Sequence, residues 1–382
     1  MRKDISKKNI KQKKMLVSRK LIDFTIKDLH LFDVNRINRI ATNQNGQIYH
    51  LNAKRYAGDT KTYEIKDDDT SFFFNMKYCP RGTFERGIDK KELNTIYKDY
   101  AEFHFFSNSC EPKESCQISQ GFWMSETLVT KEIFLAVMNF IHMKNQHESI
   151  EVIHDQLTWF TCIDFCNKLS VLLGFEPCYI MEDVQIWNGS REPQIKEAKV
   201  SLNMGANGFR LPTETEWEYA AKANQDFKFA GSDDLNEVCQ HNGHYHLGRY
   251  LAKKNLKNEN IPKQFKTNAW GLYDMSGYKQ WCIDVFYPYS DINKLKNTQT
   301  QFYTPKYFVD NIYNKYYDRT SKIDPFIFFD DIKGSERVTR GGSPGEQCHG
   351  PDFLNVCRNK NVPYQTEAGI RLVRNDFHES FE

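Results

Sequence analysis

Residues 208–221 read GFRLPTETEWEYAA and carry the clearest structural signal in the chain. Thr213 followed by Glu216 is the pattern of a capping box, in which each side chain accepts a hydrogen bond from a backbone N–H that the first helical turn leaves unsatisfied. The acidic residues of this turn also suit the positive end of the helix dipole. We therefore predict a helix that begins directly after Thr213. Its expected core-facing residues are Trp217, Ala220 and Ala221.

Upstream of this helix, apolar residues at helical spacing predict two further helices. Thr130 is a suitable N-cap for the first, and the second follows Thr158. Short runs rich in aromatic residues predict strands at 72–76 and 122–124, and residues 80–84 predict a turn into another strand. The expected order is therefore strands first, then helices interleaved with loops.

The chain divides into one large domain and shorter flanking segments. Residues 1–20 hold nine Lys or Arg and one acidic residue, so we expect a disordered, solvated basic tail. We expect residues 21–70 to form an N-terminal appendage, 71–376 the main domain and 377–382 a short tail. Beyond residue 225 helical patterning fades into segments rich in Asn, Gly, Tyr and Lys. Long irregular loops of this kind usually carry function.

Composition excludes several classes of protein. The 382 residues are 40% hydrophobic and 14% aromatic, which is ample for a packed core. The net charge of +2 gives no attraction to nucleic acid or to a membrane surface. No apolar run is long enough for a transmembrane helix, and the basic N-terminus lacks the apolar core of a signal peptide. We therefore expect a cytoplasmic protein that contacts neither a membrane nor nucleic acid.

The ten cysteines show no regular CxxC spacing, which argues against a zinc ribbon. In a reducing compartment most should be thiols that pack as small apolar residues. Cys162 and Cys166 share one face of a predicted helix, and this face is apolar. We expect these two to pack in the core rather than to bind a metal.

Four blocks of sequence occur in an order and spacing that resemble the formylglycine-generating-enzyme, or sulfatase-modifying-factor, family. They are GFRLPTETEWEYAA at 208–221, NAWGLYDMSG at 268–277, RVTRGGS at 337–343 and GIRLV at 369–373, the last two as a closing pair of strands. The resemblance spans residues 72–374 and implies an α+β fold related to C-type lectins, with little regular secondary structure and long loops. Because functions on one scaffold differ, this fold does not by itself indicate an activity.

The oxidase of this family, as the resemblance implies, binds copper(I) with two cysteines placed three and eight positions after the serine of the Gly-Gly-Ser block. Soft thiolates select Cu(I). After Ser343 those positions hold Glu346 and Pro351, whereas the only nearby thiols are Cys348 and Cys357, nine residues apart. We expect the copper site to be absent. The alternative is a displaced Cys348–Cys357 copper pair with Ser343 beside it, in a copper-dependent formylglycine-generating oxidase acting on a cysteine of a sulfatase-like substrate.

The second block continues differently from the family, which usually has Asn-Val-Trp-Glu-Trp after Asp-Met-Ser-Gly. Tyr278 stands in place of the Asn and Gln280 in place of the Glu, whereas Trp281 and Asp284 match. The resemblance places structural calcium here on oxygen ligands, so calcium stays an alternative with a degraded ligand motif. We expect Trp281 to anchor the core and Asp284 to act as a local hydrogen-bonding partner.

A histidine-rich segment, HNGHYH at 241–246, offers a second candidate metal site. His244 and His246 could ligate a transition metal if a third ligand came from elsewhere. Asn242 falls where the resemblance implies a calcium-binding asparagine, and imidazole suits zinc, copper or iron better than calcium. A solvated loop without metal is the third interpretation.

The favoured function is binding of a protein, peptide or glycan through the C-terminal loops. The expected binding residues are Tyr278, Gln280, Trp281, Glu346, His349 and Asn355. An aromatic-rich stretch at 302–317 would either contribute to this surface or hold a long insertion against the domain. The resemblance also implies an iron-dependent branch of the family, which we do not expect here because no His-x3-His-x-Glu cluster precedes the domain. Oligomeric state stays open.

Overall fold

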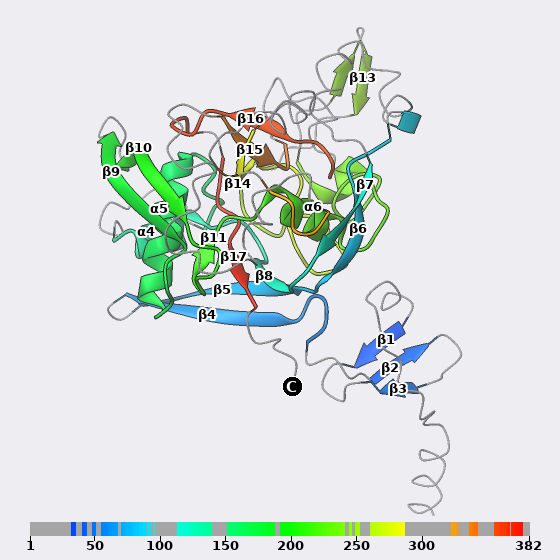
Figure 1. Ribbon diagram of the computed structural model, residues 1–382. Helices are drawn as coiled ribbons and strands as arrows, with labels where there is room; N and C mark the ends of the chain where they lie inside the picture. The colour runs from blue at the N-terminus through cyan, green and yellow to red at the C-terminus, as the bar shows by residue number, and fades with distance from the viewer. Residues whose placement is uncertain are drawn as a thin grey trace, which may run out of the picture.

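The protein is described by a computed structural model, and the fold is built from antiparallel strands with few helices (Figure 1). The residues that the structure describes are 32–35, 40–43, 48–50, 55–67, 70–89, 91–92, 95, 113–139, 151–187, 192–240, 244–246, 249–252, 260–286, 322–326, 328, 336–342, 355–366 and 368–376.

A five-stranded antiparallel sheet with the order β11-β17-β8-β5-β4 forms the base of the main domain. The strands are β4 (Thr60–Asp67), β5 (Thr70–Cys79), β8 (Phe122–Ser125), β11 (Phe209–Arg210) and β17 (Val373–Asn375). The predicted strands at 72–76 and 122–124 are thus confirmed as parts of β5 and β8.

The first strand of this sheet lies within the segment that sequence alone assigned to an appendage. Backbone pairing runs from Thr60 opposite Lys77 to Asp67 opposite Thr70, so β4 and β5 form one hairpin. The expected boundary at residue 71 is therefore corrected, because the sheet of the main domain already includes Thr60. Upstream, β1, β2 and β3 form a small antiparallel sheet of their own.

The remaining strands form short sheets. β14 pairs with β15 and β15 with β16, β6 pairs with β7, β9 with β10 and β12 with β13. Their bounds are β1 (Phe32–Asn35), β2 (Ile40–Asn43), β3 (Ile48–His50), β6 (Gly82–Arg86), β7 (Glu114–Ile118), β9 (Tyr179–Trp187), β10 (Gln194–Leu202), β12 (His244–His246), β13 (Arg249–Ala252), β14 (Gln280–Val285), β15 (Arg337–Arg340) and β16 (Asn359–Asn361). The two blocks expected as a closing pair of strands contribute β15 and β17, which lie in different sheets.

The helices whose bounds the structure gives are α4 (Lys131–Val137), α5 (Trp159–Leu172), α6 (Glu214–Lys222) and α7 (Leu235–Val238). The predicted N-caps Thr130 and Thr213 are confirmed, since each accepts a hydrogen bond from a backbone N–H of the first turn. The helix expected to follow Thr158 does so, and Thr158 caps it in the same way. At Thr213 both halves of the capping box form. The helix α6 ends where Ala223 adopts the left-handed conformation, with a φ of 44°.

Two apolar cores lie on either side of β14. Trp281 and Ile283 pack into the core that surrounds α5, whereas Cys282 packs into the core beneath α6. This follows from the two-residue period of a strand, which points neighbouring side chains to opposite faces. Trp217, Ala220 and Ala221 belong to the second core, as predicted, and Cys162 and Cys166 belong to the first. In the part of the chain that is described, no helix is long and apolar enough to cross a membrane.

The capping box at Thr213 gives a direct test of this fold. Thr213→Ala should lower the free energy of unfolding by about 1 kcal/mol, because the Glu216 N–H loses its acceptor in a buried position. Thr213→Ser keeps the hydroxyl and should lose less. Urea unfolding of the three proteins measures this. Equal losses in the two variants would show that the threonine methyl, not the hydrogen bond, stabilises the helix start.

Candidate functional site

The helix α6 carries a cluster of buried charges. Arg340 donates to Glu214 at 2.9 Å and to Glu218 at 3.0 Å, and Arg358 donates to Glu214 at 3.2 Å. All four side chains are at most 2% exposed. Buried charges are costly unless each one is paired and hydrogen-bonded. This cluster satisfies that condition with two carboxylates and two guanidinium groups.

Glu218 and Arg340 of this cluster stay ionised at neutral pH. Burial alone would raise the pKa of Glu218, but the charges of Lys222 and Arg340 hold it at about 2. Burial likewise acts to lower the pKa of Arg340, and the carboxylates of Glu214 and Glu218 outweigh it, so this pKa is raised. The Glu218 carboxylate therefore acts as a fixed negative partner and not as a proton donor or acceptor near pH 7.

The same cluster positions the C-terminal loop. Arg340 also donates to the backbone carbonyl of Asn355 at 2.9 Å and to that of Cys357 at 3.2 Å. The side chain of Asn355 donates to the carbonyl of Phe227 at 3.2 Å, and its N–H donates to the carbonyl of Lys228 at 2.9 Å. Residues 355–358 are thus held between α6 and the loop that follows it.

These contacts change the roles expected of several predicted site residues. Asn355 is 1% exposed and supports the loop at 227–228, so the expectation that it contacts a ligand is corrected. Trp281 is fully buried and donates from its indole N–H to the carbonyl of Leu157 at 2.9 Å, which confirms it as a core anchor. Asp284 accepts from the N–H of Glu214 at 2.7 Å, as a local partner should.

Tyr278 and Gln280, also expected to bind a ligand, are likewise turned inward. The hydroxyl of Tyr278 accepts a hydrogen bond from Gln240 at 2.9 Å. Gln280 is fully buried, and its side-chain oxygen accepts from the indole of Trp217 at 2.8 Å and from Arg371 at 3.0 Å. Both positions replace residues of the family pattern with side chains that make internal hydrogen bonds.

Of the two cysteines in the alternative copper pair, the structure describes Cys357, which is fully buried. Cys348 and Ser343 lie outside the described residues, as do Glu346, His349, Asn242 and the aromatic stretch at 302–317. The backbone of His244 and of His246 lies in β12, and their side chains are outside the description. Within the described ranges, no group of three or more His, Cys, Asp or Glu side chains could hold a metal ion.

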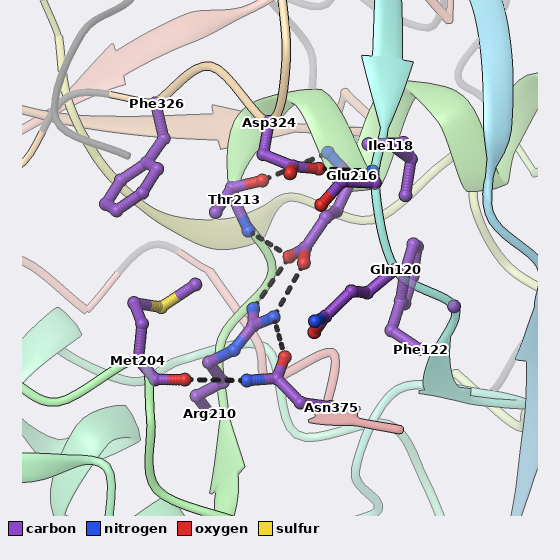
Figure 2. Close-up of a pocket in the computed structure, with 12 residues that line it drawn as sticks. Ile118, Gln120, Phe122, Met204, Arg210, Thr213, Glu216, Asp324, Phe326 and Asn375 are labelled. Carbon is purple, nitrogen blue, oxygen red and sulfur yellow. Dashed lines mark hydrogen bonds and ion pairs between the residues drawn. The ribbon is translucent and has the colours of Figure 1, made fainter. Parts of the chain in front are cut away.

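A small pocket lies at the start of α6 (Figure 2), and its volume is about 40 Å³. Arg210 donates two hydrogen bonds to the carboxylate of Glu216, at 2.6 and 2.7 Å, and also donates to Asn375. Asp324 accepts from the N–H of Ser119 at 2.8 Å. This space is near the size of a water site, and its polar groups bond to one another. It is therefore part of the support of α6 and not a ligand site.

A larger cleft of about 410 Å³ lies between β6, α6 and the C-terminal loop. The rings of Phe84 and Tyr219 form its aromatic floor, with centroids 5.0 Å apart. Lys222 lies beside them, where its ammonium group contacts the carbonyl of Glu85 at 2.6 Å. Phe227, 37% exposed, lies in the wall. The volume of the cleft lies in the range of ligand sites, and its lining is mostly polar, with Phe84, Ile88, Tyr219, Phe227 and Val356 as its large apolar residues.

Sequence reasoning missed this cleft. Its floor joins a strand near residue 84 with a helix near residue 219, and Val356 closes it from the C-terminal loop. Figure 1 shows β6 and α6 side by side, which their contacts also indicate. The local signal was restricted to an aromatic residue in each element, and such residues occur throughout this chain.

Comparison with known proteins now identifies the class. The family described as "Sulfatase-modifying factor enzyme 1-like domain" matches residues 65–376. Because this match covers most of the chain, the protein belongs to the sulfatase-modifying-factor family. A solved structure, Treponema denticola variable protein 1, shares its fold with a TM-score of 0.53 and 23% identity, covering 83% of this chain and 99% of that one. The family and the α+β fold class expected from the sequence are thus confirmed.

Two curated relatives match about two fifths of the chain. One is "Chaperone protein LppX" of Paenibacillus barcinonensis, 34% identical over 176 residues, or 42% of this chain and 61% of that protein. The other is the formylglycine-generating enzyme of Streptomyces coelicolor, 25% identical over 173 residues, or 43% of this chain and 45% of that protein. The chain therefore spans less than two thirds of either relative.

The ionised state of Glu218 predicts a pH dependence of stability. Its pKa is lower in the folded protein than the usual 4.5, so its contribution is present above pH 4.5 and is lost as the pH falls toward 2. We expect roughly 3 kcal/mol of the stability lost between pH 6 and pH 2 to come from this group.

Urea unfolding across that range should therefore show a shallower decline for Glu218→Gln than for the wild type. Glu237→Gln is the control, since the side chain of Glu237 is 49% exposed in a surface ion pair. The same slope in Glu218→Gln and the wild type would contradict the assigned ionisation of Glu218.

Proposed function

We propose that this protein is a non-oxidase member of its family and binds a polypeptide through the cleft between β6, α6 and the C-terminal loop. The observation that carries the proposal is the burial of Cys357 inside the loop that forms one wall of this cleft. A copper oxidase needs thiolates that O₂ can reach through the bound metal. Here the backbone at Cys357 is instead bound to Arg340, in a role that supports the wall.

The chemistry of the cleft favours a peptide segment. Aromatic surface for an apolar side chain comes from Phe227, which is 37% exposed, and from Phe84, whose ring packs on the buried Tyr219. Both signs of charge line the cleft, with Lys222, Lys228 and Glu85 among the charged residues. This mixture suits the polar backbone and mixed side chains of a polypeptide. A relative that shares part of the chain is named as a chaperone protein, and this name also supports a polypeptide partner.

The alternative function is the copper-dependent formylglycine-generating oxidase with Cys348 and Cys357 as a displaced pair. A relative named for that activity shares 25% identity over less than half of the chain. The shifted cysteine spacing and the burial of Cys357 favour the binding function over this alternative. A cytoplasmic location, expected from the sequence, stays a prediction.

Copper(I) titration of the reduced protein separates the two functions. We expect no tight stoichiometric binding that depends on both Cys348 and Cys357, because one of the two thiols is enclosed in the loop. The comparison is between the wild type, Cys348→Ala and Cys357→Ala. Equimolar binding that both substitutions abolish would restore the oxidase interpretation, and a cysteine-containing peptide would then be assayed with O₂.

Binding to an array of short synthetic peptides tests the cleft itself. The full-length protein should bind a subset enriched in apolar residues, and Phe227→Ala should weaken this binding about tenfold, because the wall loses aromatic surface. The matched control is Phe73→Ala on β5, since Phe73 is 61% exposed and does not line the cleft.

Equal binding by both variants would place the peptide elsewhere on the protein. Absence of binding to every peptide, combined with binding to a glycan array, would replace the polypeptide partner with a carbohydrate.

A further inference from the structure

The side-chain amide of Gln280 lies inside a ring of backbone carbonyl groups. Its nitrogen, Nε2, donates to the carbonyl of Asp274 at 2.9 Å and lies 3.3 Å from the carbonyls of Met275 and Tyr278. Its oxygen, Oε1, faces the donors of Trp217 and Arg371 on the other side. Because an amide nitrogen only donates and its oxygen only accepts, these partners determine which way the group points.

The ring is a built feature of the loop that connects to β14. Gly341 has a φ of +95°. Gly277, which lies next to it in the fold, has a φ of +101°. The N–H of Gly277 donates to the carbonyl of Gly341 at 2.7 Å. A Cβ atom at Gly341 would lie 2.4 Å from the carbonyl oxygen of Tyr278 and 3.0 Å from Nε2 of Gln280. Only glycine fits at position 341, because the backbone carbonyls and the side-chain amide of Gln280 leave no space for a Cβ atom.

Converging carbonyl oxygens with one carboxylate are a ligand set that calcium prefers. The family resemblance implies calcium in this part of the fold and a Glu at the position of Gln280. The backbone carbonyls here would suit such an ion. Gln280 does not, since it directs N–H groups and no carboxylate oxygen into the ring. The buried guanidinium of Arg371 also donates to the carbonyl of Asp274 at 3.1 Å, which occupies the same oxygen.

We propose that the amide of Gln280 replaces a structural cation, so that the loop at 274–278 is held without calcium. The partial positive charge of the N–H groups satisfies the carbonyl oxygens that an ion would otherwise bind. The proposal also implies that one substitution restores a cation site. Gln280→Glu keeps an acceptor for Trp217 and Arg371, and its second carboxylate oxygen faces the carbonyl ring.

Thermal unfolding of the full-length protein, in EDTA and in millimolar calcium, tests this inference. The wild-type melting temperature should be the same in both conditions. Gln280→Glu should melt about 5–10 °C lower in EDTA, because its carboxylate faces carbonyl oxygens without a cation between them. Calcium should recover most of that loss in a saturable way, and magnesium should not, since it demands a smaller octahedral site.

Gln280→Met is the matched control, since the methionine side chain is similar in size to glutamine and has no amide group. It should melt at a lower temperature in both conditions, without rescue by calcium. If Gln280→Glu does not fold in EDTA, its refolding on addition of calcium supports the proposal, and its failure to refold with calcium overturns it. The proposal would also be overturned if calcium stabilised the wild type in a saturable way and Gln280→Met abolished this effect.

Discussion

The ion pairs of Arg340 with Glu214 and Glu218 are the interaction on which the rest of the structure depends. They join the first turns of α6 to β15 and, through Arg358 and the carbonyls of residues 355–357, to the C-terminal loop. Removing one partner of a buried ion pair destabilises a protein by several kcal/mol. Replacing all the charged groups with apolar residues costs less. The cluster therefore acts as one unit, and the cleft beside α6 takes its shape from it.

Hydrogen bonds from side chains to the backbone support the irregular segments among the described residues. Arg371 donates to the carbonyls of Ser125, Tyr273 and Asp274, and Gln280 satisfies more of the same loop. A buried backbone carbonyl without a partner is costly, so irregular segments need such donors where a helix or sheet would supply its own. Burial lowers the pKa of Arg371 to about 10, which still leaves it charged at neutral pH.

These features also show which parts of the family scaffold support the fold in this chain. The residues that match the family most closely build the ion cluster, the capping box and the two cores, all of which support the fold. The positions that depart from the family, Tyr278 and Gln280, make internal hydrogen bonds that need no metal. These supporting contacts need no oxidase chemistry, and the cleft near residues 84 and 219 is the surface at which we propose binding.

The sequence by itself determined the features that depend on near neighbours. The capping box needs only Thr213 and Glu216, three residues apart, and the strands and N-caps follow from equally short patterns. Tertiary structure decided the rest, because the partners are distant. Gln280 bonds to Trp217 and Arg371 across 63 and 91 residues, and Arg340 reaches Glu214 across 126. No local pattern encodes such pairings, so Gln280 and Asn355 looked like ligand contacts in the sequence. Burial among distant partners makes them supports of the fold.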